Sequence, residues 1–357
     1  MIKKILIILI LSFFISGCSK KTSQEILTFT SWGSITEVKV LNKIIKDFEQ
    51  ENPNIKINFI HTPENYFQKL HLLFASNTAP DVIFINNLYL PLYASHLEDL
   101  TNIVDKSKFY EQSLESLSYD GKILAMPRDV SNLVFYINKD IISSIRIKTL
   151  DDLLKTAQEA TNEKTWGISF EEDIYYIYPY LSYFNEIFDE NYDYKNSKGF
   201  KFYKDLRQKY KVAPTRSQVG SFTLAQMFLD KKIAIYLSGR WMFPKIKEKA
   251  TFNWEIVSFP TAQKNFPIDA SGWAISKNSK NKDLAIRFIK YLSSEKSAEY
   301  FANTGLIVPA RIEASKILNN NEYNEKVFLE IIKNSKNTYI PKNYKKHVDN
   351  FNSKAFD

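Results

Sequence analysis

Apolar and polar positions in the first part of the chain alternate in blocks that predict strands and helices in turn. A β-prone run at 26–30 ends at the turn cluster 31–34. Apolar side chains then recur every three or four residues from about 36 to 51, which predicts a helix that stops before Asn52 and Pro53. Three further patterns complete this part: strand-like alternation at 55–59, a helical period over 67–74 and the fully apolar run 82–85. This order predicts a doubly wound α/β sheet, whose ligands bind in a cleft at the carboxyl ends of the strands.

A second α/β series begins near Leu150 and indicates a second lobe. Its expected elements are helix 150–160, strand 166–170, helix 198–210, helix 222–230, strand 233–237 and strand 254–258. Two further helices, 282–293 and 295–303, are expected after Gly272. The chain has 357 residues, of which 44% are hydrophobic, and this exceeds the usual size of one hydrophobic core. Two lobes are therefore expected.

The first 17 residues have the pattern of a secretory signal peptide. Lys3 and Lys4 precede an apolar stretch at 5–15 that is too short to span a bilayer stably. The sequence Ile15-Ser16-Gly17-Cys18 contains the only cysteine and resembles the lipobox of bacterial lipoproteins, which implies a lipid on Cys18 and a polar tether over 18–25. The alternative is an ordinary signal peptide with a buried cysteine. We expect an exported protein anchored to the bacterial membrane, facing the periplasm or the cell exterior.

The charge balance is basic, at +8 for the whole chain. Loss of residues 1–17 removes two of the 48 basic residues and leaves 46 against 40 acidic ones, a net charge of +6. A basic chain could bind nucleic acid or an anionic membrane. Here the lysines are interspersed with acidic residues and no nucleic-acid-binding motif is present, so a solvated surface is expected. We expect a monomer without a nucleic-acid partner.

Seven short motifs are spaced along the chain: Trp32-Gly33-Ser34, Phe48-Glu49, Asn52-Pro53-Asn54-Ile55-Lys56, Ala79-Pro80-Asp81-Val82, Asp120-Gly121-Lys122 before Met126-Pro127, Tyr136-Ile137-Asn138-Lys139-Asp140 and Ile275-Ser276-Lys277-Asn278-Ser279-Lys280-Asn281. Together, from about 26 to 311, they resemble the extracellular solute-binding proteins of family 1, which are similar to maltose-binding protein. The chain departs from the family pattern at 147–150, after 175–183 and at Lys231-Lys232. The resemblance implies the substrate-binding lipoprotein of an ABC transporter, which captures a sugar or oligosaccharide and delivers it to the permease subunits.

The same resemblance implies two doubly wound α/β lobes joined by a hinge of several chain crossings, the type II periplasmic-binding-protein fold. The first lobe is expected to contain 26–130 and 261–309. The second is expected to contain 131–260 and 310–357, including the C-terminal helices. The crossings are expected near 129–133, 257–262 and 308–312.

A sugar presents a flat apolar face edged with hydroxyl groups, so its site requires aromatic rings and polar side chains. Trp32, Trp241 and Trp273 lie beside the glycines at 33, 239 and 272, where loops follow strands, and are the candidate stacking platforms. Packing in the core is the alternative for each indole. The other candidate ligand-binding residues are Ser34, Glu64, Tyr66, Asn86, Asn87, Arg128, Asp129, Tyr176, Tyr180, Gly239, Arg240, Gly272 and Arg311.

Each of these polar candidates also has a structural alternative. The arginines could form structural ion pairs, the asparagines could be solvated caps, and at least half of the tyrosines in 175–183 are expected in the core. The family also includes proteins that bind sugar phosphates or glycerophosphodiesters. Those ligand classes therefore stay open, as does the choice between a monosaccharide and an oligosaccharide.

The sequence contains none of the common catalytic motifs. It lacks a Gly-x-Ser-x-Gly elbow, a phosphate-binding glycine loop and a His-Glu-x-x-His pair, and its four histidines are far apart. We therefore expect no catalysis, no metal and no cofactor. A glycosidase, which needs only two carboxylates, and a carbohydrate-binding surface adhesin are the alternatives from other functional classes.

Overall fold

The computed structural model describes residues 24–260, 266–319 and 322–356. The proposed signal peptide, Cys18 and most of the tether lie outside these residues. Among the helices of the described part, none combines the length and apolar character that a membrane crossing requires.

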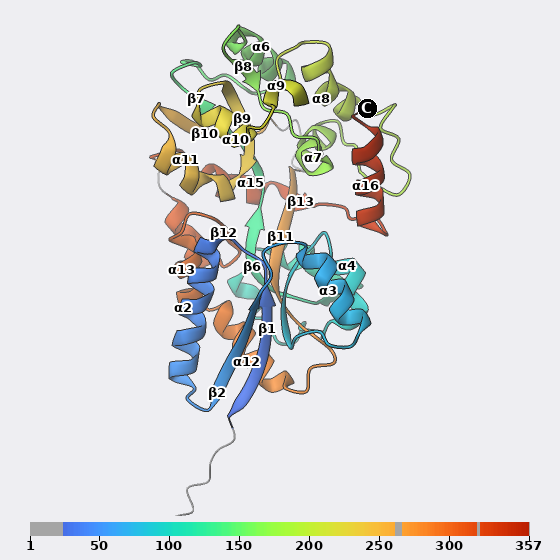
Figure 1. The fold of residues 1–357 in the computed structure, drawn as a ribbon, viewed down its shortest axis with the longest axis vertical. Helices are drawn as coiled ribbons and strands as arrows, with labels where there is room; N and C mark the ends of the chain where they lie inside the picture. Colours follow the sequence, from blue (N-terminus) through green and yellow to red (C-terminus); the bar gives the residue numbers. More distant parts are fainter. Residues whose placement is uncertain (1–23, 261–265, 320–321, 357) are drawn as a thin grey trace, which may run out of the picture.

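The first lobe is built on a mixed sheet that has seven strands in the described part of the chain (Figure 1). The strand order is β12-β6-β11-β3-β1-β2, and β13 pairs with β11. The strands are β1 (Glu25–Ser31), β2 (Ile55–His61), β3 (Val82–Asn86), β6 (Met126–Ser131), β11 (Phe266–Ile275), β12 (Val308–Pro309) and β13 (Ser335–Asn337). Strands β1, β2 and β3 are parallel, as the alternating pattern predicts, whereas β11 is antiparallel to β3 and β6.

Helices cover this sheet because their apolar stripes match its buried faces. In α2 (Ile35–Glu51) the buried residues are Leu41, Ile44, Ile45 and Phe48, and the helix begins at a capping box between Ser34 and Glu37. The other helices of this lobe are α3 (Tyr66–Ala75), α4 (Leu90–Tyr93), α5 (Glu111–Ser116), α12 (Lys282–Leu292), α13 (Glu295–Ala302) and α14 (Ile312–Ser315). The lobe also contains three short 3-10 helices, η1 (Ala94–His96), η2 (Lys106–Lys108) and η4 (Lys316–Leu318). It is completed by a hairpin of β4 (Ser118–Tyr119) and β5 (Lys122–Ile123).

The second lobe is built on a smaller mixed sheet with the order β10-β7-β9-β8. Its strands are β7 (Leu133–Asn138), β8 (Trp166–Ile168), β9 (Ile233–Gly239) and β10 (Trp254–Ser258). Its helices are α6 (Leu150–Ala160), α7 (Ile174–Tyr183), α8 (Lys198–Gln208), α9 (Arg216–Val219), α10 (Leu224–Leu229), η3 (Arg240–Met242), α11 (Phe243–Lys249), α15 (Val327–Lys333) and α16 (Tyr344–Lys354). In Figure 1, α16 lies beside α7 on the side of this lobe that faces α3 and α4 of the first lobe.

The chain passes between the two sheets where one strand ends and the next begins. Strand β6 belongs to the large sheet and β7 to the small one, so one crossing lies at residue 132. The return crossing lies between β10 and β11, and a third follows η4. Strand β13, expected in the second lobe, instead returns to the large sheet between α15 and α16. Residues 311–315, expected in the second lobe, instead contact the first: the Tyr110 hydroxyl lies 2.7 Å from that of Ser315.

Candidate functional site

A pocket with a volume of about 440 Å³ lies between the lobes. The first lobe supplies most of its lining, and the second lobe supplies Tyr175 from α7 and Trp241 from η3. The lining residues are Trp32, Glu37, Phe84, Asn86, Leu88, Arg128, Asp129, Ser131, Tyr175, Trp241, Asp269, Ala270, Ser271, Leu306 and Ile307. We call this space the cleft pocket.

Two indole rings line the cleft pocket from opposite lobes. Trp32 follows β1 and is 43% exposed, and its ring centroid lies 5.7 Å from that of Phe84. Trp241 follows β9, and its ring lies 6.2 Å from that of Tyr175. A Cβ atom on Gly239 would lie 1.9 Å from the Trp241 ring, so only glycine lets this indole fold back over the end of β9. The two rings offer apolar surface that is not covered by the core.

A buried arginine organises the charged wall of the cleft pocket. The Nη2 atom of Arg128 lies 2.5 Å from the Oε1 atom of Glu37, and its Nε atom lies 3.8 Å from the Oδ2 atom of Asp129. Burial raises the pKa of Glu37, but Arg128 and the capping hydrogen bonds of Ser34 outweigh it, so that pKa lies below its ordinary value. For Asp129, burial prevails over the attraction of Arg128 and raises the pKa. The Ser271 hydroxyl donates a hydrogen bond to Asp129.

A third carboxylate, Asp269 of β11, also lines the cleft pocket. It accepts a hydrogen bond from the Nδ2 atom of Asn87, at 3.0 Å, and Thr338 and Tyr175 lie close to it. Burial raises the pKa of Asp269 more than these neighbours lower it. Tyr175 and Asp269 line the cleft pocket from opposite lobes, because α7 belongs to the second lobe and β11 to the first. The cleft pocket therefore combines stacking surfaces with acceptors for hydroxyl or amide donors.

The family model for bacterial extracellular solute-binding proteins matches residues 43–327. The chain belongs to this family. The family expected from the short motifs is thereby confirmed, and its members are binding proteins rather than enzymes.

This solute-binding protein is similar to the maltodextrin-binding protein of Bacillus subtilis, with 26% identity over 354 residues, covering 88% of this chain and 82% of the relative. The galactooligosaccharide-binding protein of the same species is 25% identical over 322 residues, covering 81% and 75%. An ABC substrate-binding protein from Listeria monocytogenes in complex with cycloalternan has a TM-score of 0.83, with 25% identity over 93% of each chain. The two-lobed α/β fold is confirmed by this similarity.

Five of the candidate residues of the solute-binding protein meet at the cleft pocket: Trp32, Asn86, Arg128, Asp129 and Trp241. Asn87 is buried behind it and holds Asp269. Ser34 caps α2 and acts on the pocket only through Glu37.

Three aromatic candidates lie in the core instead of the cleft, and the structure corrects them. The Trp273 indole is fully buried against Phe29 and Phe84, so it has no face free for a ligand. Tyr180 is fully buried beside Phe259. Tyr66 is buried, and its hydroxyl donates to the Phe84 carbonyl at 2.9 Å.

The remaining candidates have structural roles or lie away from the cleft pocket. Arg240 forms a buried ion pair with Glu325 at 2.6 Å, and the Nη1 atom of Arg311 donates to the Ser293 carbonyl at 3.1 Å. At Gly272 a Cβ atom would lie 2.4 Å from the Met126 carbonyl oxygen, so glycine allows β11 to approach β6. Two further candidates do not line the pocket: Glu64 is exposed, and Tyr176 packs edge-on against Tyr175.

Sequence reasoning missed several lining residues. Glu37 was hidden because an acidic residue in the first turn of a helix is a common capping residue. Asp269 carried a usable signal, since it is the only charged residue in the stretch 266–275, where every other side chain is apolar or small. A lone carboxylate in a buried strand requires a partner or a function. In the described part of the chain, no cluster of three acidic, histidine or cysteine side chains could hold a metal ion.

Proposed function

We propose that this protein captures a sugar or oligosaccharide between its lobes and delivers it, unaltered, to the permease subunits of an ABC importer. The observation that carries the proposal is the pairing of Trp32 and Trp241, one from each lobe, around a pocket that also presents Asp129 and Asp269. An indole stacks on the apolar face of a sugar ring, and a carboxylate accepts hydrogen bonds from its hydroxyl groups. Closure of the lobes would bury both faces of the ring.

The printed names of relatives support a carbohydrate ligand. One relative is maltodextrin-binding, another is galactooligosaccharide-binding, and the similar Listeria structure contains cycloalternan. A sugar phosphate or glycerophosphodiester head group fits the cleft pocket less well, because Glu37, Asp129 and Asp269 stand against the single cation Arg128.

We further propose that the protein is an exported monomer held to the bacterial membrane by lipid on Cys18, and that it has no catalytic activity. The support is the lipobox-like sequence before Cys18 and membership in a family of extracellular binding proteins. The acidic side chains of the cleft pocket already accept hydrogen bonds from Arg128, Ser271 and Asn87, which suits fixed acceptors better than a proton donor to a leaving group.

A thermal-shift panel of mono-, di- and trisaccharides, sugar phosphates and glycerophosphodiesters tests the ligand class. A ligand at about 100 times its Kd stabilises the folded protein by roughly 2.7 kcal/mol, which moves the Tm by several degrees. We expect a shift with a carbohydrate and recovery of that carbohydrate with unchanged mass. No shift with any carbohydrate would reject a sugar ligand, and a change in mass would restore the glycosidase alternative.

A further inference from the structure

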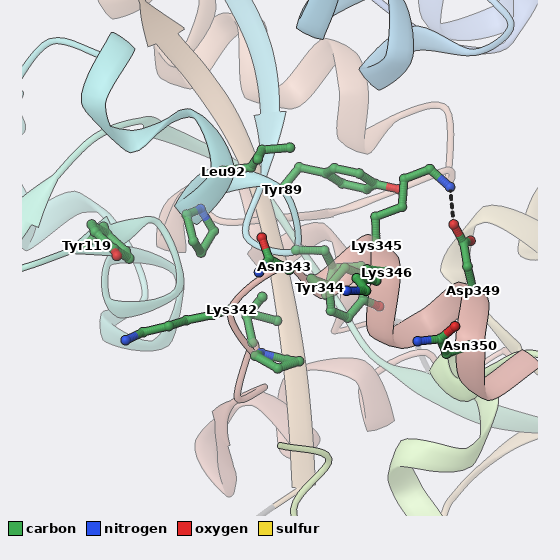
Figure 2. Close-up of a pocket in the computed structure, with 14 residues that line it drawn as sticks. Tyr89, Leu92, Tyr119, Lys342, Asn343, Tyr344, Lys345, Lys346, Asp349 and Asn350 are labelled. Atoms are coloured by element: carbon green, nitrogen blue, oxygen red, sulfur yellow. Dashed lines mark hydrogen bonds and ion pairs between the residues drawn. The ribbon is translucent and has the colours of Figure 1, made fainter. Parts of the chain in front are cut away.

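A second hollow, larger than the cleft pocket, lies beside it between the first lobe and the C-terminal segment (Figure 2). Its volume is about 720 Å³, and Leu88 lines both spaces. We call it the C-terminal groove. It is lined by Leu88, Tyr89, Pro91, Leu92, Tyr119, Ile340, Pro341, Lys342, Asn343, Tyr344, Lys345, Lys346, Asp349 and Asn350.

The first-lobe wall of the C-terminal groove is aromatic, apolar and uncharged. The Tyr89 ring is stacked on Phe67 at 3.8 Å with an angle of 8° between the planes, which fixes its position. Leu92 and Tyr119 are 51% and 38% exposed. Exposed apolar side chains that gather at a hollow indicate a binding surface. Figure 2 shows Tyr89 and Leu92 on one side and Lys342 and Tyr344 on the other.

The facing wall, from residues 340–350, is basic. Among its lining residues are three lysines and one acid, Asp349. Lys345 neutralises that acid, with its Nζ atom 2.7 Å from the Oδ2 atom. Neither Lys342 nor Lys346 forms an ion pair in the part of the chain that the structure describes. The nearby carboxylate of Glu190, which does not line the groove, accepts a hydrogen bond from the main-chain N–H of Lys342 at 2.6 Å.

The charge of the cleft pocket has the opposite sign. Three carboxyl groups and one guanidinium group line it, and Leu88 lines both spaces. An anionic group is therefore disfavoured in the cleft pocket and favoured in the C-terminal groove. Lysine is also a common partner of carboxylate and phosphate groups. Many other lysines of this chain cover solvated helix faces, but Lys342 and Lys346 line a hollow next to a ligand site.

We propose that the C-terminal groove is a second compartment of the ligand site and that it binds the anionic end, a carboxylate or phosphate, of an acidic oligosaccharide whose neutral rings occupy the cleft pocket. This inference rests on the proposed carbohydrate-binding function. It adds that the preferred ligand is negatively charged at one end and long enough to extend from the cleft pocket into the C-terminal groove.

Titration calorimetry with matched chains tests the inference. The probes are maltotetraose and galactotetraose, each in one neutral and three anionic forms. The anionic forms carry a carboxylate at the reducing end, a uronic acid at the non-reducing end, or a phosphate at the non-reducing end. We expect at least one anionic form to bind about threefold to tenfold more tightly than its neutral parent, since one exposed ion pair changes an equilibrium constant by up to about fivefold. This gain should shrink as salt rises from about 0.1 M to about 1 M, because the screening length falls from about 10 Å to about 3 Å.

Two double variants separate a local effect from a general charge effect. Lys342→Gln with Lys346→Gln should abolish the gain and leave the affinity for the neutral chain unchanged. Lys326→Gln with Lys333→Gln removes the same charge from exposed positions outside the groove and should keep the gain. Equal binding of neutral and anionic chains, or a gain that survives the first double variant, overturns this inference alone. Absence of binding by every chain counts instead against the proposed function.

Discussion

Asn87 holds Asp269 in place through one amide group. Its Nδ2 atom donates a hydrogen bond of 3.0 Å to the Oδ1 atom of Asp269, and its Oδ1 atom accepts one of 3.2 Å from the amide of Ala270. Asn87 directly follows β3, and Asp269 lies in the neighbouring strand β11. The orientation of a carboxylate in the cleft pocket therefore depends on a buried residue that does not itself line that pocket.

Replacement of Asn87 by alanine should weaken both folding and ligand binding. The buried carboxylate of Asp269 loses a donor, and an unsatisfied buried group costs about 1–3 kcal/mol. Urea unfolding should show a loss of this size, and calorimetry should show a lower affinity for the sugar that stabilises the wild type. Asn281→Ala removes an exposed amide that donates to the Ile26 carbonyl and is the control. Unchanged affinity in Asn87→Ala would show that Asp269 does not contact the ligand.

The pKa values of Asp129 and Asp269 predict that ligand affinity falls in acid. Burial raises both above the ordinary value of about 3.9. A protonated carboxyl group is a poorer acceptor for sugar hydroxyl groups, so the Kd should increase as the pH falls from 7 through these raised values. Calorimetry at several pH values measures this change. A pH-independent Kd over that range would contradict a role for the two carboxylates.

Whereas ligand affinity should fall in acid, the folding stability of the wild type relative to the variant Asp269→Asn should rise. Because the pKa of Asp269 is higher in the folded than in the unfolded state, its contribution favours folding below about pH 3.9 and is lost as the pH rises through the folded pKa. The wild type should thus gain stability relative to Asp269→Asn as the pH falls from 7 toward 4. Denaturant unfolding of both proteins measures the difference, and a constant difference would contradict the raised pKa.

Arg128 should matter for stability as well as for the site. Arg128→Met leaves the carboxylates of Glu37 and Asp129 without their buried cation. Breaking a buried ion pair from one side costs about 3–5 kcal/mol. Denaturant unfolding should show a loss of this order, whereas Lys43→Met, which removes an exposed partner of Asp47, should have little effect. Equal effects of the two changes would contradict a special role for the buried pair.

Much of the fold follows from local patterns in the sequence. The period of the apolar residues in 36–51 and the stop at Asn52 correspond to α2, which ends at residue 51. The apolar run at 82–85 corresponds to the buried strand β3. Strand β11 was not predicted, because its pattern includes a proline, a carboxylate and a glycine and it pairs with β3, β6 and β13, which are distant in the sequence.

The site followed less completely, because loop position does not fix the direction of a side chain. Trp241 follows a glycine by two residues and Trp273 follows one directly, yet only Trp241 faces the cleft. The reason is the secondary structure: Gly272 lies inside β11, so Trp273 is a strand residue that points into the core, whereas Gly239 ends β9 and Trp241 lies in the turn η3 that follows. Residues held by distant partners, such as Asp269 and Asn87, depend on strand pairing that local patterns do not show.

The lipid anchor is testable through Cys18. Cys18→Ala removes the only thiol of the chain and should move the protein from the membrane fraction to the soluble fraction. Stable attachment needs more than one acyl chain, which a lipidated N-terminal cysteine would provide. Fractionation followed by immunoblotting measures the change, with Ser19→Ala as the control. A variant that stays with the membrane would reject lipidation at Cys18.

The two tryptophans Trp241 and Trp273 should separate binding from stability. Trp241 lines the cleft pocket, so Trp241→Ala should remove most of the thermal shift caused by the sugar and leave the ligand-free Tm within a few degrees. Trp273 is fully buried, and its replacement by alanine should cost about 3–5 kcal/mol of folding free energy. Thermal melting of both variants measures the Tm of each one with and without the sugar.

The reverse pattern would show that the indoles have been assigned the wrong roles. A strongly destabilised Trp241→Ala would place its ring in the core in solution. A stable Trp273→Ala that no longer binds sugar would require a second conformation, in which this indole leaves its contacts with Phe29 and Phe84 and enters the cleft. Because such a movement would expose a large apolar ring and empty its cavity, the structure favours Trp241 as the ring that stacks on the ligand.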